Sequence, residues 1–268
     1  MGVVNVTPDS FSDGGRYVGH DDAVEHGRAL VAEGAAVIDV GGESTRPGAE
    51  PVDPIEEQRR VLPVVAALAP LVRVSIDTRH ASTAQAAVDA GASIVNDISA
   101  SLAPVAAALG VGWIAVHMKG DPRTMQKSPS YDDVVGEVRN FLVERADAAH
   151  ASGVDEVWVD PGFGFGKSLA HNMALLAHLD VLVATGHPVV VGLSRKWFLG
   201  RLLANSDARA AAPPLPGLAP QDAVRTADSD DRLEGSIGGA VWAVAQGAQM
   251  VRVHDVRPTV DAVGLVAA

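Results

Sequence analysis

The chain has 268 residues, 47% of them hydrophobic and 4% aromatic, with no cysteine and a formal net charge of −12. A chain of this length can bury one large α/β core. The absence of cysteine excludes disulfides, thiolate metal sites and cysteine nucleophiles. The negative net charge argues against nucleic acid as a partner. Because the chain has neither a long apolar run nor a basic leader, we expect a cytoplasmic protein that does not bind membranes.

Short apolar runs alternate with amphipathic helical segments along the whole chain. Val- and Ile-rich runs that end on polar residues predict strands, which we place at 2–6, 35–40, 72–76, 94–95, 113–116, 157–159, 188–191 and 250–253. Hydrophobic residues at helical spacing predict helices between them, the clearest at 21–34, 54–68, 132–152, 170–184 and 233–246. Asp21 and Asp53 are the expected caps of the first two helices.

Eight predicted strands, each followed by a helix, form the repeating unit. Glycines in the left-handed conformation are expected to end the helices, at positions 34, 91, 110, 153, 186 and 247. Right-handed crossovers then give a parallel sheet whose strands all end on one face. A doubly wound sheet is the alternative, but its usual glycine fingerprint is absent. We therefore predict an α/β fold, a (β/α)8 TIM barrel, as a single domain over 1–268.

One segment breaks this alternation. Residues 205–231 carry prolines at 213, 214, 216 and 220 and show no periodicity. Such a composition predicts a long irregular insertion at the surface, between a helix after the seventh strand and the last long helix. A lid over the site is the alternative interpretation.

A glycine-rich stretch, DPGFGFGK, covers Asp160–Lys167 after the sixth predicted strand. It ends like the phosphate-binding loop G-x-x-x-x-G-K-[ST], but Pro161 stands where the first glycine is required. The dinucleotide pattern G-x-G-x-x-G also fails, because the third glycine comes one position early. Alternating glycines and phenylalanines instead predict a backbone that approaches a flat ligand closely. Lys167 has no assigned role.

Nearly every predicted strand ends on a strongly polar residue. Taken singly, each could be an ordinary helix cap or a satisfied wall residue. In a barrel, however, they would meet at the mouth where ligands bind. The set comprises Asn5, Asp39, Asp77, Asn96, His117, Asp160, Lys196, Arg252 and His254.

Four of these residues form one chemical group. Asp77, Asn96, Asp160 and Lys196 supply carboxylates, an amide and a cation. Together they suit a flat heterocycle edged by adjacent N–H donors and carbonyls, because each buried member needs a partner.

A second group is basic. Arg46, Arg252 and His254 suit phosphate oxygens, and the amide oxygen of Asn5 could join those oxygens and waters around Mg²⁺. The sequence shows no H-E-x-x-H motif and no carboxylate cluster for an all-protein metal site, and no Ser-His-Asp spacing for acyl transfer.

Eight motifs, in order over essentially the whole chain, resemble dihydropteroate synthase. Any one would be weak evidence, whereas the ordered set is specific. They are Asn5–Gly15 (NVTPDSFSDGG), Gly42–Gly48 (GESTRPG), Ser75–Thr78 (SIDT), Asn96-Asp97, Met125-Gln126, Asp160–Lys167, Ser194-Arg195-Lys196 and Arg252–Val256 (RVHDV).

The resemblance implies a (β/α)8 transferase of folate biosynthesis. Such an enzyme joins 6-hydroxymethyl-7,8-dihydropterin diphosphate to p-aminobenzoate, giving 7,8-dihydropteroate and diphosphate. The resemblance also implies Mg²⁺ as cofactor, a homodimer, and membership of a class of sulfonamide targets.

The resemblance assigns site roles residue by residue. The implied pterin-binding positions are Asp77, Asn96, Ile98, Asp160, Gly192 and Lys196. The p-aminobenzoate positions are Phe11, Thr45, Pro47, Phe165 and Trp197. The diphosphate positions are Asn5, Arg46, Arg252 and His254, with Asn5 also the metal ligand. The implied catalytic residues are Asp13, Arg46 and Lys196.

Two rival functions and one departure stand beside this assignment. A pterin-binding methyltransferase barrel would share Asp77, Asn96 and Asp160 but would not need the basic group for diphosphate. A non-catalytic paralogue would have lost the loop acid or a diphosphate ligand, yet Asp13 and Asn5 are present. Trp197 stands where many members of the family carry a small hydroxyl that meets the aminobenzoate carboxylate.

Overall fold

The structure is a computed structural model of the chain, and it describes residues 1–7, 18–44, 51–121, 124–211 and 232–267. Within these ranges the predicted eight strands are all present and parallel. They are β1 (Gly2–Asn5), β2 (Val37–Gly41), β3 (Arg73–Asp77), β4 (Ile94–Asp97), β5 (Gly112–Val116), β6 (Val157–Asp160), β7 (Val190–Val191) and β8 (Met250–Val251).

The strands close into a barrel. Strands β1 to β6 pair in sequence order, and β7 pairs with β8. Two parallel bridges join these sheets, Val159 to Val189 on one side and Gly2 to Val253 on the other. The second bridge is held by Val3 N donating to Val253 O at 3.0 Å and Val253 N donating to Met1 O at 2.9 Å. All strands therefore point their carboxyl ends to one mouth.

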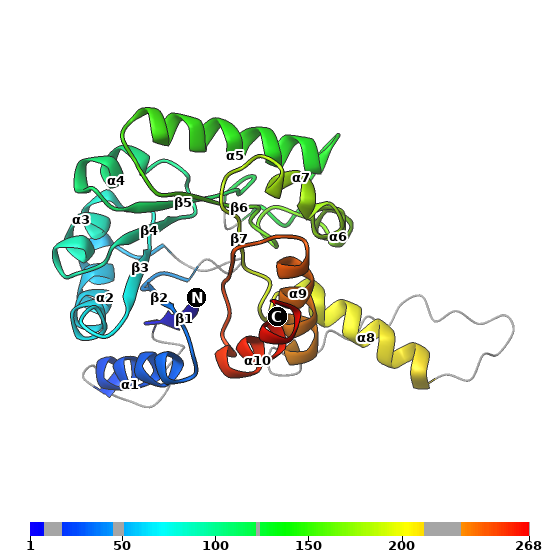
Figure 1. Ribbon diagram of the computed structural model, residues 1–268, viewed down its shortest axis with the longest axis horizontal. Helices are drawn as coiled ribbons and strands as arrows, with labels where there is room; N and C mark the ends of the chain where they lie inside the picture. The colour runs from blue at the N-terminus through cyan, green and yellow to red at the C-terminus, as the bar shows by residue number, and fades with distance from the viewer. Residues whose placement is uncertain (8–17, 45–50, 122–123, 212–231, 268) are drawn as a thin grey trace, which may run out of the picture.

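Helices surround the strands (Figure 1). They are α1 (Val18–Ala32), α2 (Pro54–Leu68), α3 (Ala81–Asp89), α4 (Ala103–Leu109), α5 (Val134–Ala151), α6 (Leu169–Ala177), α7 (Leu179–Val183), α8 (Trp197–Ala211), α9 (Leu233–Ala245) and α10 (Val256–Ala267). Helix α8 extends away from the rest of the molecule in this view. No helix in the described part of the chain is both long and apolar enough to cross a membrane.

Most of the predicted helix boundaries, marked by terminal glycines and N-cap residues, are confirmed. All six predicted glycines have a positive φ, and Asp53 caps α2 by accepting a hydrogen bond from Ile55 N. Pro63 lies inside α2 without ending it. The predicted cap at Asp21 is wrong, because α1 begins at Val18 and Asp21 falls in its first turn.

Two predicted boundaries differ from the structure. The single helix at 170–184 is two helices, α6 and α7, which meet at His178. Helix α8 continues to Ala211, so residues 205–211 of the predicted irregular insertion are helical. Alanine-rich sequence favours helix there until the first proline at 213.

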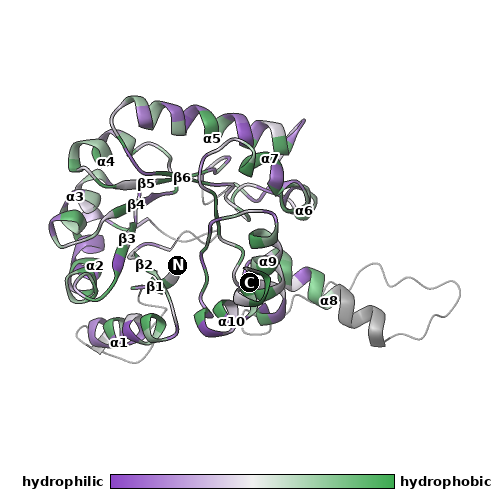
Figure 2. Cartoon of the chain, viewed as in Figure 1, coloured by the Kyte–Doolittle hydropathy of each residue, from purple (hydrophilic) through white to green (hydrophobic). Residues whose placement is uncertain are grey.

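Hydrophobic side chains form two clusters, one on each side of the strand wall. The larger lies between strands and helices and includes Ile38, Val40 and Leu68. The smaller fills the barrel interior with Val37, Ile94, Ile98, Ile114, Val116 and Val190, and Phe165 packs against it. Figure 2 shows the hydrophobic colour concentrated along the strands and mixed colours on the surrounding helices.

Candidate active site

The site residues continue the inward-facing rows of the strands. Side chains alternate between the two faces of a strand, so positions two apart share a face. Ile94 and Ile98 belong to the interior cluster, and Asn96 lies between them on the same face. Trp158 and Met250 also pack against this cluster. Asp160 and Arg252 each follow two positions later, and so lie on the same inward face. The polar rim is therefore the uppermost layer of the barrel's own core.

Arg252 joins two carboxylates across this mouth. Its Nε lies 2.6 Å from Asp39 Oδ2 and its Nη2 lies 2.7 Å from Asp77 Oδ2. Asn96 Nδ2 donates to the same Asp39 oxygen at 3.0 Å. Arg252 was sorted with the basic group from sequence, but its guanidinium lies among the acids of the first group, so the two predicted groups are not separate.

Burial decides the charge balance of this cluster. Desolvation raises the pKa of Asp77 to about 7, with Asp39 adding to the rise and Arg252 opposing it. Desolvation alone would lower the pKa of Arg252, but the two carboxylates outweigh it and the net shift is upward. Arg252 therefore stays charged while Asp77 can hold or release a proton near neutral pH.

Asp160 keeps one carboxylate oxygen for a ligand. Its Oδ1 accepts a hydrogen bond of 2.7 Å from Gly162 N, and its side chain is only 7% exposed. Burial raises the pKa of Asp160, against the opposing effects of that hydrogen bond and of Lys196. Oδ2 accepts no hydrogen bond from the described residues, and a β-carbon placed on Gly192 would lie 3.7 Å from it. The predicted pterin positions Gly192 and Asp160 are thus neighbours.

Lys196 is presented over the glycine-rich loop. The preceding Arg195 has a φ of 57°, unusual outside glycine, and its guanidinium contacts Asp255 at 2.7 Å. This pair fixes the turn, which sets Lys196 Nζ 3.9 Å from the centroid of the Phe165 ring. Burial and Arg252 lower the pKa of Lys196 to about 8, while Asp160 opposes the shift. Lys196 Nζ has no hydrogen bond to the described residues, which leaves its donors for a ligand.

The glycine-rich loop lies directly on the loop that follows β5. Gly162 and Gly166 have φ values of 65° and 62°. A β-carbon on Gly162 would lie 1.8 Å from His117 O, and one on Gly166 would lie 2.0 Å from Lys119 O. Only glycine fits this approach. The stretch is therefore packed tightly against the backbone that follows β5 and presents Phe165, while the predicted approach to a flat ligand stays a prediction.

His254 is neutral in this structure. Burial, with Arg252 and Arg195 adding, lowers the pKa of His254 to about 3. Its backbone N donates to Ser194 Oγ at 3.1 Å, and Nδ1 lies 3.0 Å from the same oxygen. Because Ser194 Oγ accepts from the backbone, its proton can go to Nδ1, which leaves Nε2 as a donor. His254 therefore offers a neutral N–H donor suited to a phosphate oxygen, and its predicted diphosphate role stays a prediction.

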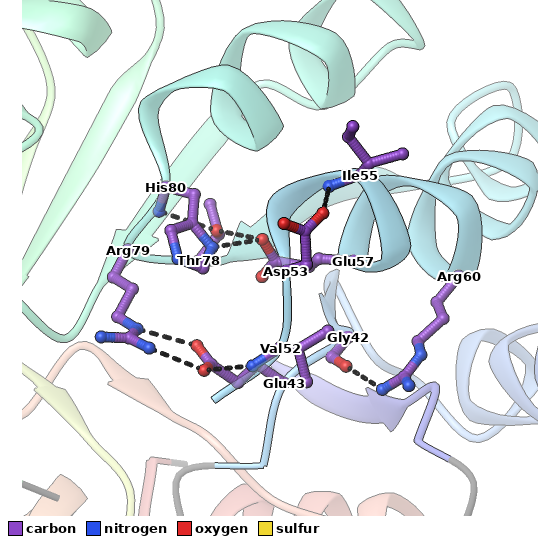
Figure 3. A network of polar contacts seen from close by, with 10 residues as sticks. All are labelled: Gly42, Glu43, Val52, Asp53, Ile55, Glu57, Arg60, Thr78, Arg79 and His80. Carbon is purple, nitrogen blue, oxygen red and sulfur yellow. Dashed lines mark hydrogen bonds and ion pairs between the residues drawn. The ribbon is translucent and has the colours of Figure 1, made fainter. Parts of the chain in front are cut away.

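A polar network ties the loops after β2 and β3 together (Figure 3). Arg79 donates to both oxygens of Glu43, at 2.9 Å from Nε and 2.8 Å from Nη2. Val52 N donates to Glu43 Oε1 at 3.1 Å. Burial raises the pKa of Glu43, but the hydrogen bonds from Arg79 and Val52 outweigh it and the net pKa is lowered. Glu43 therefore clamps both ends of the segment that contains Thr45, Arg46 and Pro47.

The same network contains a group with metal-binding side chains. Glu43, Glu57 and His80 each offer one ligand atom within 4.8 Å of the others. Glu57 Oε2 already accepts from Thr78 Oγ1 at 3.0 Å and lies 2.9 Å from His80 Nδ1. Protein donors hold both oxygens of Glu43 and Glu57 Oε2, which supports a structural role for the group, while Glu57 Oε1 is buried without a hydrogen bond to the described residues.

Comparisons with known proteins match this chain over its length. A family described as "Pterin binding enzyme" matches residues 1–254. The dihydropteroate synthase of Mycobacterium leprae is 48% identical, covering 100% of this chain and 92% of that protein, and that of Escherichia coli K12 is 42% identical, covering 100% and 90%.

The chain belongs to the dihydropteroate synthase family. Solved structures of the family superpose on it. The Yersinia pestis synthase with a sulfonamide drug complex has a TM-score of 0.86 at 41% identity, covering 100% of this chain and 92% of that one. The Xanthomonas albilineans synthase with 4-aminobenzoic acid has a TM-score of 0.84 at 43% identity, covering 99% and 90%. The predicted (β/α)8 barrel and transferase family are thereby confirmed.

The described residues bring most of the implied family positions to one mouth. Asn5, Asp77, Asn96, Ile98, Asp160, Phe165, Gly192, Lys196, Trp197, Arg252 and His254 lie at or just after strand ends. Five further positions, Phe11, Asp13, Thr45, Arg46 and Pro47, lie outside the described residues.

Two residues near the mouth were named from the sequence without a specific role, Asp39 in the strand-end set and Lys167 in the glycine-rich stretch. Asp39 is fully buried and binds Arg252 and Asn96, and its Oδ1 has no hydrogen-bond partner among the described residues. Its signal was an acid inside an apolar strand, between Ile38 and Val40. Lys167 is the other, and its signal was only the motif in which it stands. His117, by contrast, is the satisfied wall residue that the simpler interpretation predicted, because it bonds Lys167 and packs edge-on against Phe141.

Proposed function

We propose that this chain condenses 6-hydroxymethyl-7,8-dihydropterin diphosphate with p-aminobenzoate, giving 7,8-dihydropteroate and diphosphate. One observation carries the proposal beyond family membership. At the barrel mouth, Asp160 Oδ2 and Lys196 Nζ form no hydrogen bonds with the described residues, while their backbones and neighbours are fixed. Buried polar groups are normally paired, so this arrangement supports a polar, flat ligand as the missing partner.

The pterin is proposed to bind among Asp77, Asn96, Asp160 and Lys196. The carboxylates accept from its amino and ring N–H groups, and Lys196 donates to its carbonyl and ring nitrogen. Ile98 and Val116, both in the interior cluster, supply an apolar surface for the ring. Gly192 lies beside Asp160, and a β-carbon there would be in van der Waals contact with Asp160 Oδ2 at 3.7 Å.

The diphosphate is proposed to lie toward β1 and β8. Arg252 and the Nε2–H of His254 face it, together with Arg46, which lies outside the described residues. The amide of Asn5, the last residue of β1, forms no hydrogen bond with described groups and is half-buried. A neutral oxygen of this kind fits Mg²⁺, which keeps waters and takes most remaining ligands from substrate phosphates. Bound there, Mg²⁺ would neutralise charge on the leaving diphosphate.

The p-aminobenzoate is proposed to stack against Phe165, near Trp197. The Trp197 Nε1 is buried and has no hydrogen-bond partner within the described part of the chain, and a β-carbon on Gly164 would lie 3.9 Å from it. An indole N–H is a donor only, so it suits the aminobenzoate carboxylate in place of the hydroxyl that many family members carry. Phe11, Thr45 and Pro47 would complete this wall.

Catalysis is proposed to rest on departure of the diphosphate. An aryl amine is a weak nucleophile, so the methylene carbon must become electron-poor before attack. Arg252 stabilises the charge that develops on the leaving group, and the carboxylates of Asp77 and Asp160 stabilise positive character on the pterin. Asp13 in the first loop is proposed to help order that loop and exclude water, which would otherwise hydrolyse the activated carbon.

The partner and location expectations belong to the same proposal. We infer a cytoplasmic homodimer. Exposed apolar side chains on the neighbouring helices α6, α9 and α10 support the dimer: Met173 at 37%, Trp242 at 46%, Val260 at 43% and Leu265 at 84%.

Turnover tests the proposal directly. The purified chain is incubated with the dihydropterin diphosphate, p-aminobenzoate and Mg²⁺, and dihydropteroate and diphosphate are quantified. Equimolar formation of both products is expected. Diphosphate release without dihydropteroate would refute the condensation, and no turnover with tight pterin binding would favour a non-catalytic paralogue.

A further inference from the structure

Lys167 is a fully buried lysine that forms no ion pair among the described residues, with 0% of its surface exposed. Lysine is almost never fully buried unless it is paired. Its Nζ instead contacts four acceptors: His117 Nδ1 at 2.9 Å, Gly162 O at 3.0 Å, Phe165 O at 3.1 Å and His117 O at 3.3 Å.

All four acceptors are uncharged. Three are backbone carbonyls, and burial together with the charge of Lys167 lowers the pKa of His117 to about 3. His117 is therefore neutral and can accept through Nδ1. Burial lowers the pKa of Lys167 to about 7, with Asp160 opposing the shift, because a buried ammonium without an ion pair opposes folding. An uncharged residue of the same size would avoid this free-energy cost. The presence of a lysine, with its directional hydrogen bonds, therefore needs another explanation.

The loop geometry supplies one. The left-handed glycines Gly162 and Gly166 bring this loop onto the end of β5, and their turns aim the carbonyls of Gly162 and Phe165 inward, away from any strand ladder. Lys167 gathers these carbonyls and that of His117 on one nitrogen. A single side chain thus joins the loop after β6 to the end of β5.

Phe165 is the link to the active site. Its carbonyl is held by Lys167 and its ring faces Lys196 Nζ at 3.9 Å. Gly164, next to it, donates from N to Asn172 Oδ1 at 2.8 Å. Lys167 and Asn172 therefore hold the backbone at Phe165 and at the preceding Gly164.

We propose that Lys167 is a positioning residue, which acts through the Phe165 carbonyl to hold the Phe165 ring as the wall of the p-aminobenzoate subsite. The proposal rests on the proposed function for the identity of that substrate. It predicts a larger effect on p-aminobenzoate than on the pterin, because Lys167 bonds the Phe165 carbonyl directly but acts on the pterin positions Asp160 and Lys196 only electrostatically.

The test compares steady-state kinetics and pterin binding in wild type, K167M and K127M. Lys127 is an exposed lysine and the matched control. K167M keeps the length of the side chain and removes every donor. Its KM for p-aminobenzoate is expected to rise about tenfold, while the Kd of the pterin substrate in calorimetry stays within about twofold of wild type.

Two further variants keep the result interpretable. K167Q retains N–H donors and is expected to lie between wild type and K167M. Because the chain has no cysteine, K167C can be aminoethylated while unfolded and then refolded, which restores an ammonium at this position alone. We expect aminoethylation of K167C to restore the wild-type KM for p-aminobenzoate. The comparison of K167C before and after aminoethylation replaces K167M if that variant does not fold.

The possible outcomes distinguish the role of Lys167 from the proposed synthase activity. Equal losses for both substrates, unchanged kinetics in K167M, or no recovery after aminoethylation would overturn the role of Lys167. Absence of turnover in the wild type would instead overturn the proposed function. In the F165L background, K167M is expected to raise the KM by less than about twofold, since the residue through which it acts is already gone.

Discussion

The ammonium of Lys196 lies 3.9 Å from the centroid of the Phe165 ring. This contact joins a pterin-binding position to the proposed p-aminobenzoate wall. A cation over an aromatic face gains about 0.5–2 kcal/mol, depending on its exposure to water. Because the contact favours the charged form of Lys196, the ring helps to keep the lysine protonated in a site whose burial lowers its pKa to about 8.

The pH dependence of catalysis should report this lysine. We expect kcat/KM to fall as pH rises through about 8, the pKa of Lys196, because the neutral amine stabilises the pterin less. K196R should lose this alkaline limb, since arginine stays charged. F165L should move the limb to lower pH by about 0.4–1.5 units, the equivalent of the lost contact. An alkaline limb that is unchanged in K196R would show that another group titrates.

Removing the charge of Asp160 should weaken pterin binding selectively. In D160N one accepting oxygen becomes an N–H₂ group that faces the donors of the pterin. We expect the Kd of the pterin substrate, measured by calorimetry, to rise about 5- to 150-fold, the equivalent of about 1–3 kcal/mol. D155N changes an exposed acid and serves as the control. Retained pterin affinity in D160N would contradict the assignment.

Much of this site follows from strand periodicity, and the exceptions have physical causes. The position of Asn96 was predictable, since polar residues that end parallel strands meet at one face. The partners of Arg252 were not, because its ion pairs with Asp39 and Asp77 depend on distances across the barrel. The role of Lys167 was hidden as well, since a motif does not reveal that four acceptors converge on one nitrogen.

The Glu43 clamp should matter for p-aminobenzoate and for stability. E43Q replaces an acceptor of three hydrogen bonds by an amide that cannot bind Arg79 through both oxygens. We expect unfolding to become about 1–3 kcal/mol easier and the KM for p-aminobenzoate to rise, because Thr45, Arg46 and Pro47 lie between the clamped positions. E156Q breaks the ion pair of Glu156 with Arg73, away from these loops, and should leave that KM unchanged. Equal KM effects in both variants would argue against the clamp.

Trp197 should contribute a hydrogen bond to p-aminobenzoate. W197F keeps an aromatic ring and removes the Nε1 donor, which bonds none of the residues that the structure describes. If that donor meets the carboxylate, the KM for p-aminobenzoate should rise about 2- to 13-fold, the equivalent of about 0.5–1.5 kcal/mol, with little change in kcat. W242F removes an indole donor that binds Leu176 O on another face and is the control. An unchanged KM in W197F would place the carboxylate elsewhere.

The most direct measurement of the central claim is a crystal structure with a dihydropterin, p-aminobenzoate and Mg²⁺ bound. The account predicts the pterin N–H edge on Asp77 and the free oxygen of Asp160, Lys196 on its carbonyl side, and the aminobenzoate ring against Phe165. A pterin bound outside the barrel mouth, or oriented with its carbonyl toward Asp160, would contradict it.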